Sequence, residues 1–296
     1  MRVPAVGQRR AVVGMLTGCV QRVLFPQVNA ATARVLAAEG CDVVVPPGQG
    51  CCGALSLHGG RTTEAARFAR RVIDTFESAR VDAVVINSAG CGSAMKEYGA
   101  LLAAPDGHGG SGPGGDGQAG DGQGGDGQGG DGQGGDAEGW AARAEAASGK
   151  VRDLSEFLVE LYGQAGGVRA ARHELKVTAA YHDACHLAHA QRIRQQPRDL
   201  LGTIPGLEIA EVGDGGTCCG SAGVYNLLQP EAARELGQRK AASVRQTGAR
   251  LLISANPGCS LQIASALAAR GDSIATAHTA EVLDASIRGV PVPGSA

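Results

Sequence analysis

The tripeptide Cys51-Cys52-Gly53 occurs again as Cys218-Cys219-Gly220, 167 residues further along the chain. Two more pairs of cysteines keep nearly the same separation, since Cys19 and Cys185 are 166 residues apart and Cys91 and Cys259 are 168 apart. Eight of the nine cysteines therefore form two copies of one pattern. A pattern that returns in register predicts two tandem copies of one structural unit.

Each copy also alternates short apolar segments with helical ones. Strands are expected at residues 11–16, 42–45, 81–86, 176–181, 207–212 and 251–254, and helices at 26–39, 63–79, 197–201 and 229–247. Continuous runs of β-branched residues joined by helices are typical of parallel strands that are covered on both faces. The expected fold class is therefore α/β, with two tandem Rossmann-like cysteine-rich units, called CCG units after the repeated tripeptide, and mainly parallel strands.

The two copies differ by a glycine-rich insertion. Residues 155–158 resemble residues 280–283 at a separation of only 125, so the first copy carries about 43 extra residues after Cys91. Residues 107–139 hold 18 of the 47 glycines and repeat GGDGQ with a period of five. Because the segment has almost no apolar side chains to bury, we expect a disordered, extended loop without chemistry there. The expected domains are the first unit at 1–105, the insert at 106–139, the helical end of the first unit at 140–170 and the second unit at 171–296.

Composition excludes several classes of function. The 296 residues carry a formal net charge of −2, without the basic surplus that general binding to nucleic acid requires. Met1–Arg10 is polar and no apolar run reaches about 18 residues, so neither an export signal nor a membrane span is expected. Disulfides are unusual in proteins that are not exported. We expect a cytoplasmic protein that meets the inner face of a membrane only peripherally, through a complex, with cysteines that bind metal, act in catalysis or fill a core.

The repeated cysteines follow the predicted strands, in loops that lead to the next helices. Ligands of open α/β sheets bind at this edge, so three loops of each unit can bring four thiols together. The candidate metal ligands are Cys19, Cys51, Cys52 and Cys91 in the first unit, and Cys185, Cys218, Cys219 and Cys259 in the second. Four cysteines suit an iron–sulfur cluster of the [4Fe–4S] kind or an all-cysteine zinc site. Adjacent cysteines reach one small ion only with strain, which favours the cluster, while a structural or redox role of the thiols without metal stays open.

The ninth cysteine and three histidines need separate interpretations. Cys41 begins an apolar strand and has an apolar counterpart in the second copy, so we interpret it as a core thiol. His182, His186 and His189 flank Cys185. We expect a supporting or surface role for them, and direct ligation by one of them in place of a missing thiol is the alternative.

Two further groups are expected to lie outside the site. His58 follows the first CCG tripeptide, but its counterpart is Tyr225, so the repeat does not support it as a ligand. Arg67, Arg70 and Arg71 are expected on the solvated face of a helix, with a docking surface for an acidic partner as the alternative.

The segments around the cysteines resemble the cysteine-rich domains of the glycolate oxidase iron–sulfur subunit. The matching segments are LTGCVQ at 16–21, GCCGAL at 50–55, YHDACHL at 181–187 and CCGSAG at 218–223. The likeness covers nearly the whole chain except the glycine-rich insert. The wider family includes cysteine-rich subunits of lactate oxidation complexes and of heterodisulfide reductase, and the two segments of the first unit favour the glycolate branch.

The chain departs from this family in two ways. The fullest family pattern ends each unit with Cys-x-x-Cys, but the earlier position is Ser88 in the first unit and Asn256 in the second. A four-thiolate cluster, or a site completed by serine or water, is then expected in place of a five-thiolate cluster of the heterodisulfide reductase kind. The glycolate subunit also begins with two ferredoxin-like modules that this sequence lacks, so we expect a truncated start or modules on another polypeptide.

The resemblance implies an electron-transfer subunit of a glycolate oxidase or dehydrogenase complex. Such a subunit passes electrons from a flavin-bearing partner, which oxidises a 2-hydroxy acid, to a downstream acceptor. The sequence has no convincing nucleotide-binding fingerprint, so the flavin and the catalytic residues are assigned to the partner and none to this chain. The alternatives are a subunit of a lactate oxidation complex, a heterodisulfide-reductase-like component that reduces a disulfide or quinone, and a non-redox assembly module.

Overall fold

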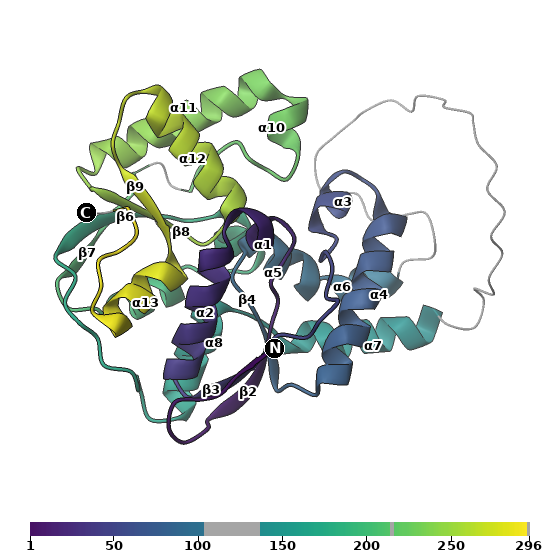
Figure 1. The fold of residues 1–296 in the computed structure, drawn as a ribbon. Coiled ribbons are helices and arrows are strands. Elements are labelled where there is room, and N and C mark those ends of the chain that lie inside the picture. The colour runs from purple at the N-terminus through teal and green to yellow at the C-terminus, as the bar shows by residue number, and fades with distance from the viewer. Residues whose placement is uncertain (104–136, 214–215, 295–296) are drawn as a thin grey trace, which may run out of the picture.

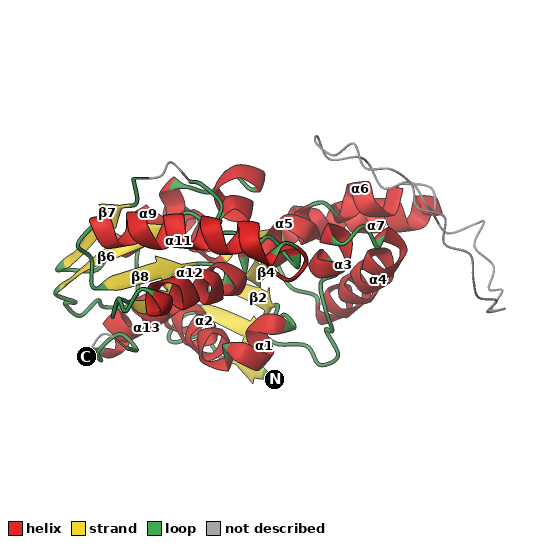
Figure 2. Cartoon of the chain, turned by 90° about the horizontal axis from the view of Figure 1, so that it is seen from above, coloured by secondary structure: helices red, strands yellow, loops and turns green. Residues whose placement is uncertain are grey.

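The computed structural model describes residues 1–103, 137–213 and 216–294, which form two α/β units (Figures 1 and 2). The first unit contains β1 (Arg2–Val3), β2 (Ala11–Met15), α1 (Val20–Leu24), α2 (Pro26–Ala38), β3 (Cys41–Val44), α3 (Ala54–His58), α4 (Thr62–Ala79), β4 (Ala83–Ile86), α5 (Ala89–Lys96), α6 (Tyr98–Ala103), α7 (Ala137–Lys150), β5 (Val151–Asp153) and α8 (Leu154–Gln164). The second contains β6 (Val177–His182), the π-helical turn η1 (His186–Ala190), α9 (Gln195–Leu201), β7 (Leu207–Glu211), α10 (Tyr225–Leu228), α11 (Pro230–Gln246), β8 (Leu251–Ser254), α12 (Pro257–Ala269), β9 (Ala275–His278) and α13 (Thr279–Arg288).

The two units repeat the same sheet. The strand order is β1-β3-β2-β4-β5 in the first and β7-β6-β8-β9 in the second. Every neighbouring pair is parallel except β1, which is added antiparallel to β3 at the edge. The equivalent central strands are β2 and β6, which carry Val13 opposite Val43 and Tyr181 opposite Ile253. The prediction of two tandem α/β units with mainly parallel strands is confirmed.

A single layer of helices lies between the two sheets. One hydrophobic core joins α2, α8, α9 and α13 to the inner face of both sheets. The strand residues that point into this layer are Val13, Met15, Val43 and Val85 from the first sheet, and Ala179, Tyr181, Leu251 and Ile253 from the second. The outer face of the first sheet is covered by α3 to α7, and the outer face of the second by η1, α11 and α12. Because neighbouring strand residues face opposite sides, the continuous apolar runs of the sequence match sheets that are buried on both faces.

The last strand of each unit is the main feature that the sequence patterns did not predict. Residues 140–170 were expected to be helical, but β5 interrupts them, and β9 has the same place in the second sheet. With three and four residues, VRD and ATAH, these strands are too short and too mixed in polarity to show a strand period. The expected insert at 106–139 lies almost wholly outside the described residues, and the domain boundaries stay a prediction.

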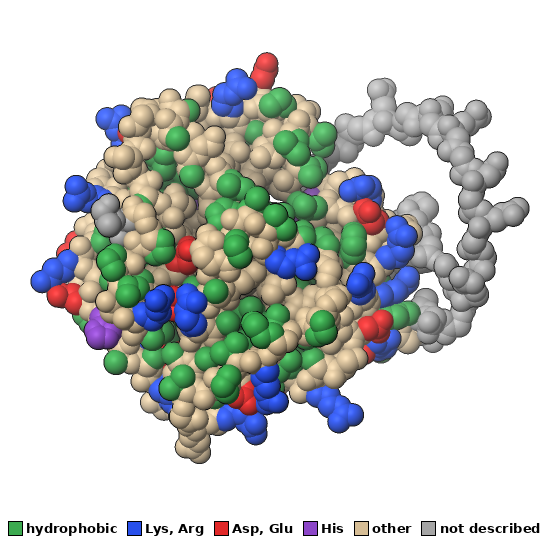
Figure 3. All heavy atoms as spheres, viewed as in Figure 1, with side chains coloured by type: hydrophobic (Ala, Val, Ile, Leu, Met, Phe, Trp, Pro, Cys, Tyr) green, Lys and Arg blue, Asp and Glu red, His purple; other side chains and the backbone are tan. Residues whose placement is uncertain are grey.

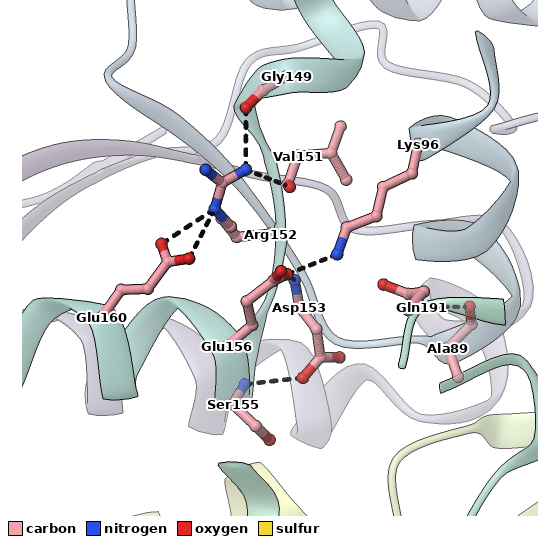
Figure 4. Close-up of polar contacts among 10 residues, drawn as sticks. All are labelled: Ala89, Lys96, Gly149, Val151, Arg152, Asp153, Ser155, Glu156, Glu160 and Gln191. Carbon is pink, nitrogen blue, oxygen red and sulfur yellow. Dashed lines mark hydrogen bonds and ion pairs between the residues drawn. The ribbon is translucent and has the colours of Figure 1, made fainter. Parts of the chain in front are cut away.

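The helices that follow β5 and β9 begin with equivalent capping boxes. Asp153 accepts a hydrogen bond from the backbone N–H of Ser155 (Figure 4). His278 accepts one from the backbone N–H of Ala280 through Nδ1. The Nε2 nitrogen of His278 also donates to the carbonyl of Asn87 at 2.8 Å. This bond joins the end of the second sheet to the end of β4 in the first, so it helps to fix the two units against each other.

Candidate metal centres

The four repeated cysteines of the first unit lie together at the carboxyl edge of its sheet. Cys19 follows β2 and precedes α1, Cys51 and Cys52 lie between β3 and α3, and Cys91 lies in the first turn of α5. The Sγ atoms of Cys19 and Cys51 are 3.6 Å apart. Cys52 contacts both Cys51 and Cys91. The predicted convergence of three loops is therefore present, although Cys91 belongs to a helix and not to the loop before it.

The second unit repeats this arrangement. Cys185 follows β6, Cys218 and Cys219 lie between β7 and α10, and Cys259 lies in the first turn of α12. Cys218 contacts Cys185 and Cys219, and Cys219 contacts Cys259. All eight candidate ligands are thus gathered in two sets of four, one at each sheet edge. That they bind metal stays a prediction.

The glycine of each CCG tripeptide is required by the backbone. Gly53 and Gly220 have φ of +84° and +90°, a region that residues with a Cβ rarely adopt. A Cβ on Gly220 would lie 2.5 Å from the carbonyl oxygen of Ala233 in α11. The same tight turn aims the glycine N–H at the first cysteine of the pair, at 3.3 Å from Sγ of Cys51 and 3.4 Å from Sγ of Cys218. These donors stabilise a thiolate.

The thiols polarise one another in the same way in both units. Each donor thiol has a raised pKa and each acceptor a lowered one, because the neighbouring cysteine shares its proton. The raised pKa values belong to Cys19, Cys52, Cys185 and Cys219, and the lowered ones to Cys51, Cys91, Cys218 and Cys259. Two sulfurs in each unit therefore carry charge on their own. Ionising the other two requires added positive charge, which metal ions supply.

The missing cysteines are replaced by polar residues that support the thiols. Ser88 lowers the pKa of Cys91, after the larger effect of the neighbouring Cys52. The Nδ2 of Asn256 donates to Sγ of Cys259 at 3.3 Å. Neither residue adds a thiolate, so each set keeps four sulfurs.

The spacing of the sulfurs tests what the sets can hold. A tetrahedral ion with bonds of about 2.3 Å places its sulfur ligands roughly 3.8 Å apart. Among the described residues, the one group of three metal-binding side chains whose ligand atoms all lie within 4.8 Å of one another is His182, Cys219 and Cys259. The four thiols of each unit therefore form an open row and not a tetrahedron. Such a row fits an acceptor with several metal ions better than a single zinc ion.

Both sets of thiols face one cavity of about 220 Å³ between the units. His58 of α3 and His186 of η1 stack across it, with ring centroids 4.8 Å apart. Exposed apolar side chains occupy the surface helices nearby, and this face carries many apolar patches (Figure 3). They are Val23 and Leu24 on α1, Leu227 and Leu228 on α10, and Leu261 on α12. The histidine pair was not predicted, because the repeat places Tyr225 opposite His58 and so gives no signal for it.

The remaining residues of interest lie as follows. Cys41 is fully buried in the core between the sheets, as expected. His189 is exposed and hydrogen-bonds to Arg194. Arg67 and Arg71 are exposed on α4, whereas Arg70 lies over the ring of Trp140. No helix within the described part of the chain is long and apolar enough to cross a bilayer.

Fold and site together define a protein of two tandem α/β units, each with a row of four cysteines at the carboxyl edge of its sheet. The family model described as a cysteine-rich domain, CCG, matches residues 13–96 and 179–264. The chain belongs to this family, and the resemblance seen in the sequence is confirmed.

Three relatives show how widely this arrangement is used. The chain is 33% identical to the probable glycolate oxidase iron–sulfur subunit of Bacillus subtilis, in a match that covers 95% of this chain and 56% of that protein. It is 28% identical to lactate utilization protein A of an Exiguobacterium species, covering 93% and 98%. It is also 28% identical to a subunit of the fumarate reductase (CoM/CoB) of Methanothermobacter marburgensis, covering 92% and 46%. The chain thus spans about half the length of the first and third relatives and nearly all of the second.

Proposed function

We propose that the protein is an iron–sulfur electron-transfer subunit of a complex that oxidises a 2-hydroxy acid, with glycolate as the favoured substrate. The observation that carries this proposal is the single cavity onto which both rows of thiols open. Two redox centres that face one small space are suited to pass electrons between them. The names of two relatives indicate complexes of this class, and the identity of 33% against 28% supports the glycolate branch.

The chain contributes ligands and an environment for negative charge. Clusters of the [4Fe–4S] kind, held by the two rows of thiolates, would accept and release single electrons. The N–H groups of Gly53 and Gly220 and the amide of Asn256 stabilise the anionic sulfurs. The flavin is assigned to partner subunits, a ferredoxin-like module to another chain, and any contact with the inner face of a membrane to the complex.

Metal analysis tests the ligands directly. Protein purified without oxygen is expected to contain iron and acid-labile sulfide in equal amounts. Cys52→Ser and Cys219→Ser should each lose about half of the iron, because each removes a ligand of one centre. Cys41→Ala is the matched control, since Cys41 is equally buried but lies in the core, and it should keep the iron. Absence of iron and sulfide from the unmodified protein, or full iron in both serine variants, would contradict the proposal.

Reconstitution tests the substrate. With its flavoprotein partners present, glycolate should reduce the centres and bleach their visible absorption faster than lactate does. The opposite order would assign the protein to a lactate complex. That second candidate is favoured by one observation, namely that this chain covers 98% of a lactate utilization protein A.

A catalytic role at the cysteines is favoured by the size of the cavity, which admits a small disulfide or quinone. An open iron position or a reactive thiol would then be required. Rapid alkylation of one cysteine in the metal-loaded protein would support this candidate, and uniform protection of the eight would exclude it.

A further inference from the structure

The two centres differ at one buried position. His182 is the last residue of β6 and is 1% exposed. Neither of its ring nitrogens has a hydrogen-bond partner among the described residues. The residue at the equivalent place in the first unit, 166 positions earlier, is Leu16, which is also 1% exposed. The repeat therefore replaces an apolar side chain beside one row of thiols with an imidazole beside the other.

The imidazole lies against the sulfurs of its own unit. The ligand atoms of His182, Cys219 and Cys259 are all within 4.8 Å of one another. Metal bonds of about 2.0–2.3 Å bring neighbouring nitrogen and sulfur ligands within roughly 4 Å of each other, so modest adjustment places these three around one ion. A buried polar group without a partner costs about 1–3 kcal/mol, and folded proteins rarely leave one without a reason. A metal ion bonded to one ring nitrogen removes much of that cost.

A purely supporting role fits this position less well. Asn256 already donates an N–H to Sγ of Cys259. Its oxygen accepts from the backbone N–H of Gly90 at 3.2 Å and from the hydroxyl of Ser88. Asn256 is therefore fully engaged and is not free to replace the thiolate that is absent from its position. His182 is the remaining buried donor atom beside the row.

The neighbouring strand offers a partner for the second ring nitrogen. Ser254 is paired with His182 in the register of β6 and β8, is fully buried, and has a hydroxyl without a partner among the described residues. A ligating histidine usually donates its other N–H to an oxygen acceptor. We propose that His182 is a metal ligand of the second centre, which thus combines imidazole with thiolates, whereas the first centre has thiolates alone.

This inference rests on the proposed iron–sulfur function and deepens it. A neutral imidazole makes the second centre less negative than an all-thiolate one, and replacement of thiolate by imidazole is known to raise the potential of iron–sulfur centres. The second unit then holds the centre with the higher reduction potential. Electrons that enter at the first unit pass to the second, so the two copies of one repeat have different roles in the transfer.

Pulsed paramagnetic resonance of the reduced full-length protein tests the ligand. The unmodified protein should show the strong ¹⁴N coupling of a coordinated imidazole. His182→Leu, which copies Leu16 into the second unit, should remove this coupling and lower the reduction potential or the iron content of one centre. His186→Leu is the matched control, because its Nδ1 lies 3.7 Å from Sγ of Cys185, and it should keep the coupling. His182→Cys should restore iron without the ¹⁴N signal if the leucine variant loses metal or folds poorly.

The outcomes separate this proposal from the function on which it rests. An iron-containing protein without imidazole coupling, or one that loses the coupling in His186→Leu and not in His182→Leu, overturns the assignment of His182 alone. Recovery of iron in His182→Asn but not in His182→Cys does the same, because asparagine supplies an N–H donor and no metal-binding nitrogen. An unmodified protein without iron overturns the electron-transfer function and this inference together.

Discussion

The hydroxyl of Ser88 lies 3.5 Å from Oδ1 of Asn256, at the place where the two units meet. Each residue stands three positions before the last thiol of its row, Cys91 or Cys259, and directly before a helix. The same oxygen accepts the backbone N–H of Gly90. Positions that carry an additional cysteine in the fullest pattern of the family therefore join the two centres here by hydrogen bonds.

Asn256→Ala should affect both stability and electron affinity. The change leaves the N–H of Gly90 without its acceptor and removes a donor from Cys259, so we expect a loss of about 1–3 kcal/mol in the free energy of unfolding. The reduction potential of the second centre should fall, because hydrogen bonds to sulfur stabilise the more negative, reduced state. Urea unfolding and a redox titration measure the two effects. Asn226→Ala is the control, since Asn226 lines the same cavity and bonds to Gln262, and it should leave the potential unchanged.

Gly220→Ala should destabilise the second unit strongly. The substitution forces a Cβ into a left-handed backbone and against the carbonyl oxygen of Ala233, and we expect a cost of about 2–4 kcal/mol. Gly248→Ala separates the two causes, because Gly248 has φ of +69° but no atom within 4 Å of its Cβ position. That control should cost only about 1 kcal/mol. Equal losses in the two variants, measured by urea unfolding, would show that the contact with α11 is unimportant.

The sequence predicted the parts of this molecule that depend on local patterns. The cysteine repeat located both rows of thiols, since each row follows strand ends that share one sheet edge. The strands β5 and β9 were missed because so few residues carry no readable period. The stack of His58 on His186 joins two units, and no local pattern encodes such a contact. His182 was placed correctly near Cys185, but its complete burial follows only from the packing of β6 between its neighbours.

The buried ion pair of Glu39 and Arg172 should be costly to break from one side. Glu39 ends α2, Arg172 precedes β6, and their side chains are 0% and 4% exposed with Oε1 and Nη2 at 2.7 Å. Arg172→Met leaves a buried carboxylate without its counter-charge, and we expect a loss of about 3–5 kcal/mol. The double variant Glu39→Gln, Arg172→Met should recover part of this loss. If thermal or urea unfolding shows additive losses instead, the two side chains do not stabilise each other.

Acid should weaken the protein through His278. Burial lowers the pKa of this histidine from 6.5 to about 4, and both ring nitrogens are engaged as donor and acceptor in the neutral form. A folded-state pKa below the unfolded value means that the unfolded chain binds the proton more readily. The stability that His278 contributes is therefore present above about pH 6.5 and is lost as the pH falls towards 4, by about 3 kcal/mol.

The equivalent residue of the first unit acts in the opposite direction. Burial raises the pKa of Asp153 from 3.8 to about 6, so its contribution is greatest below pH 3.8 and is lost as the pH rises through 6, again by about 3 kcal/mol. The two effects oppose each other between pH 4 and 6. His278→Asn keeps a helix-capping residue but should leave a protein whose stability decreases as the pH rises through this window. Asp153→Asn should leave one whose stability increases. Urea unfolding of metal-free protein at several pH values measures both slopes, and the idea fails if either variant keeps the slope of the unmodified chain.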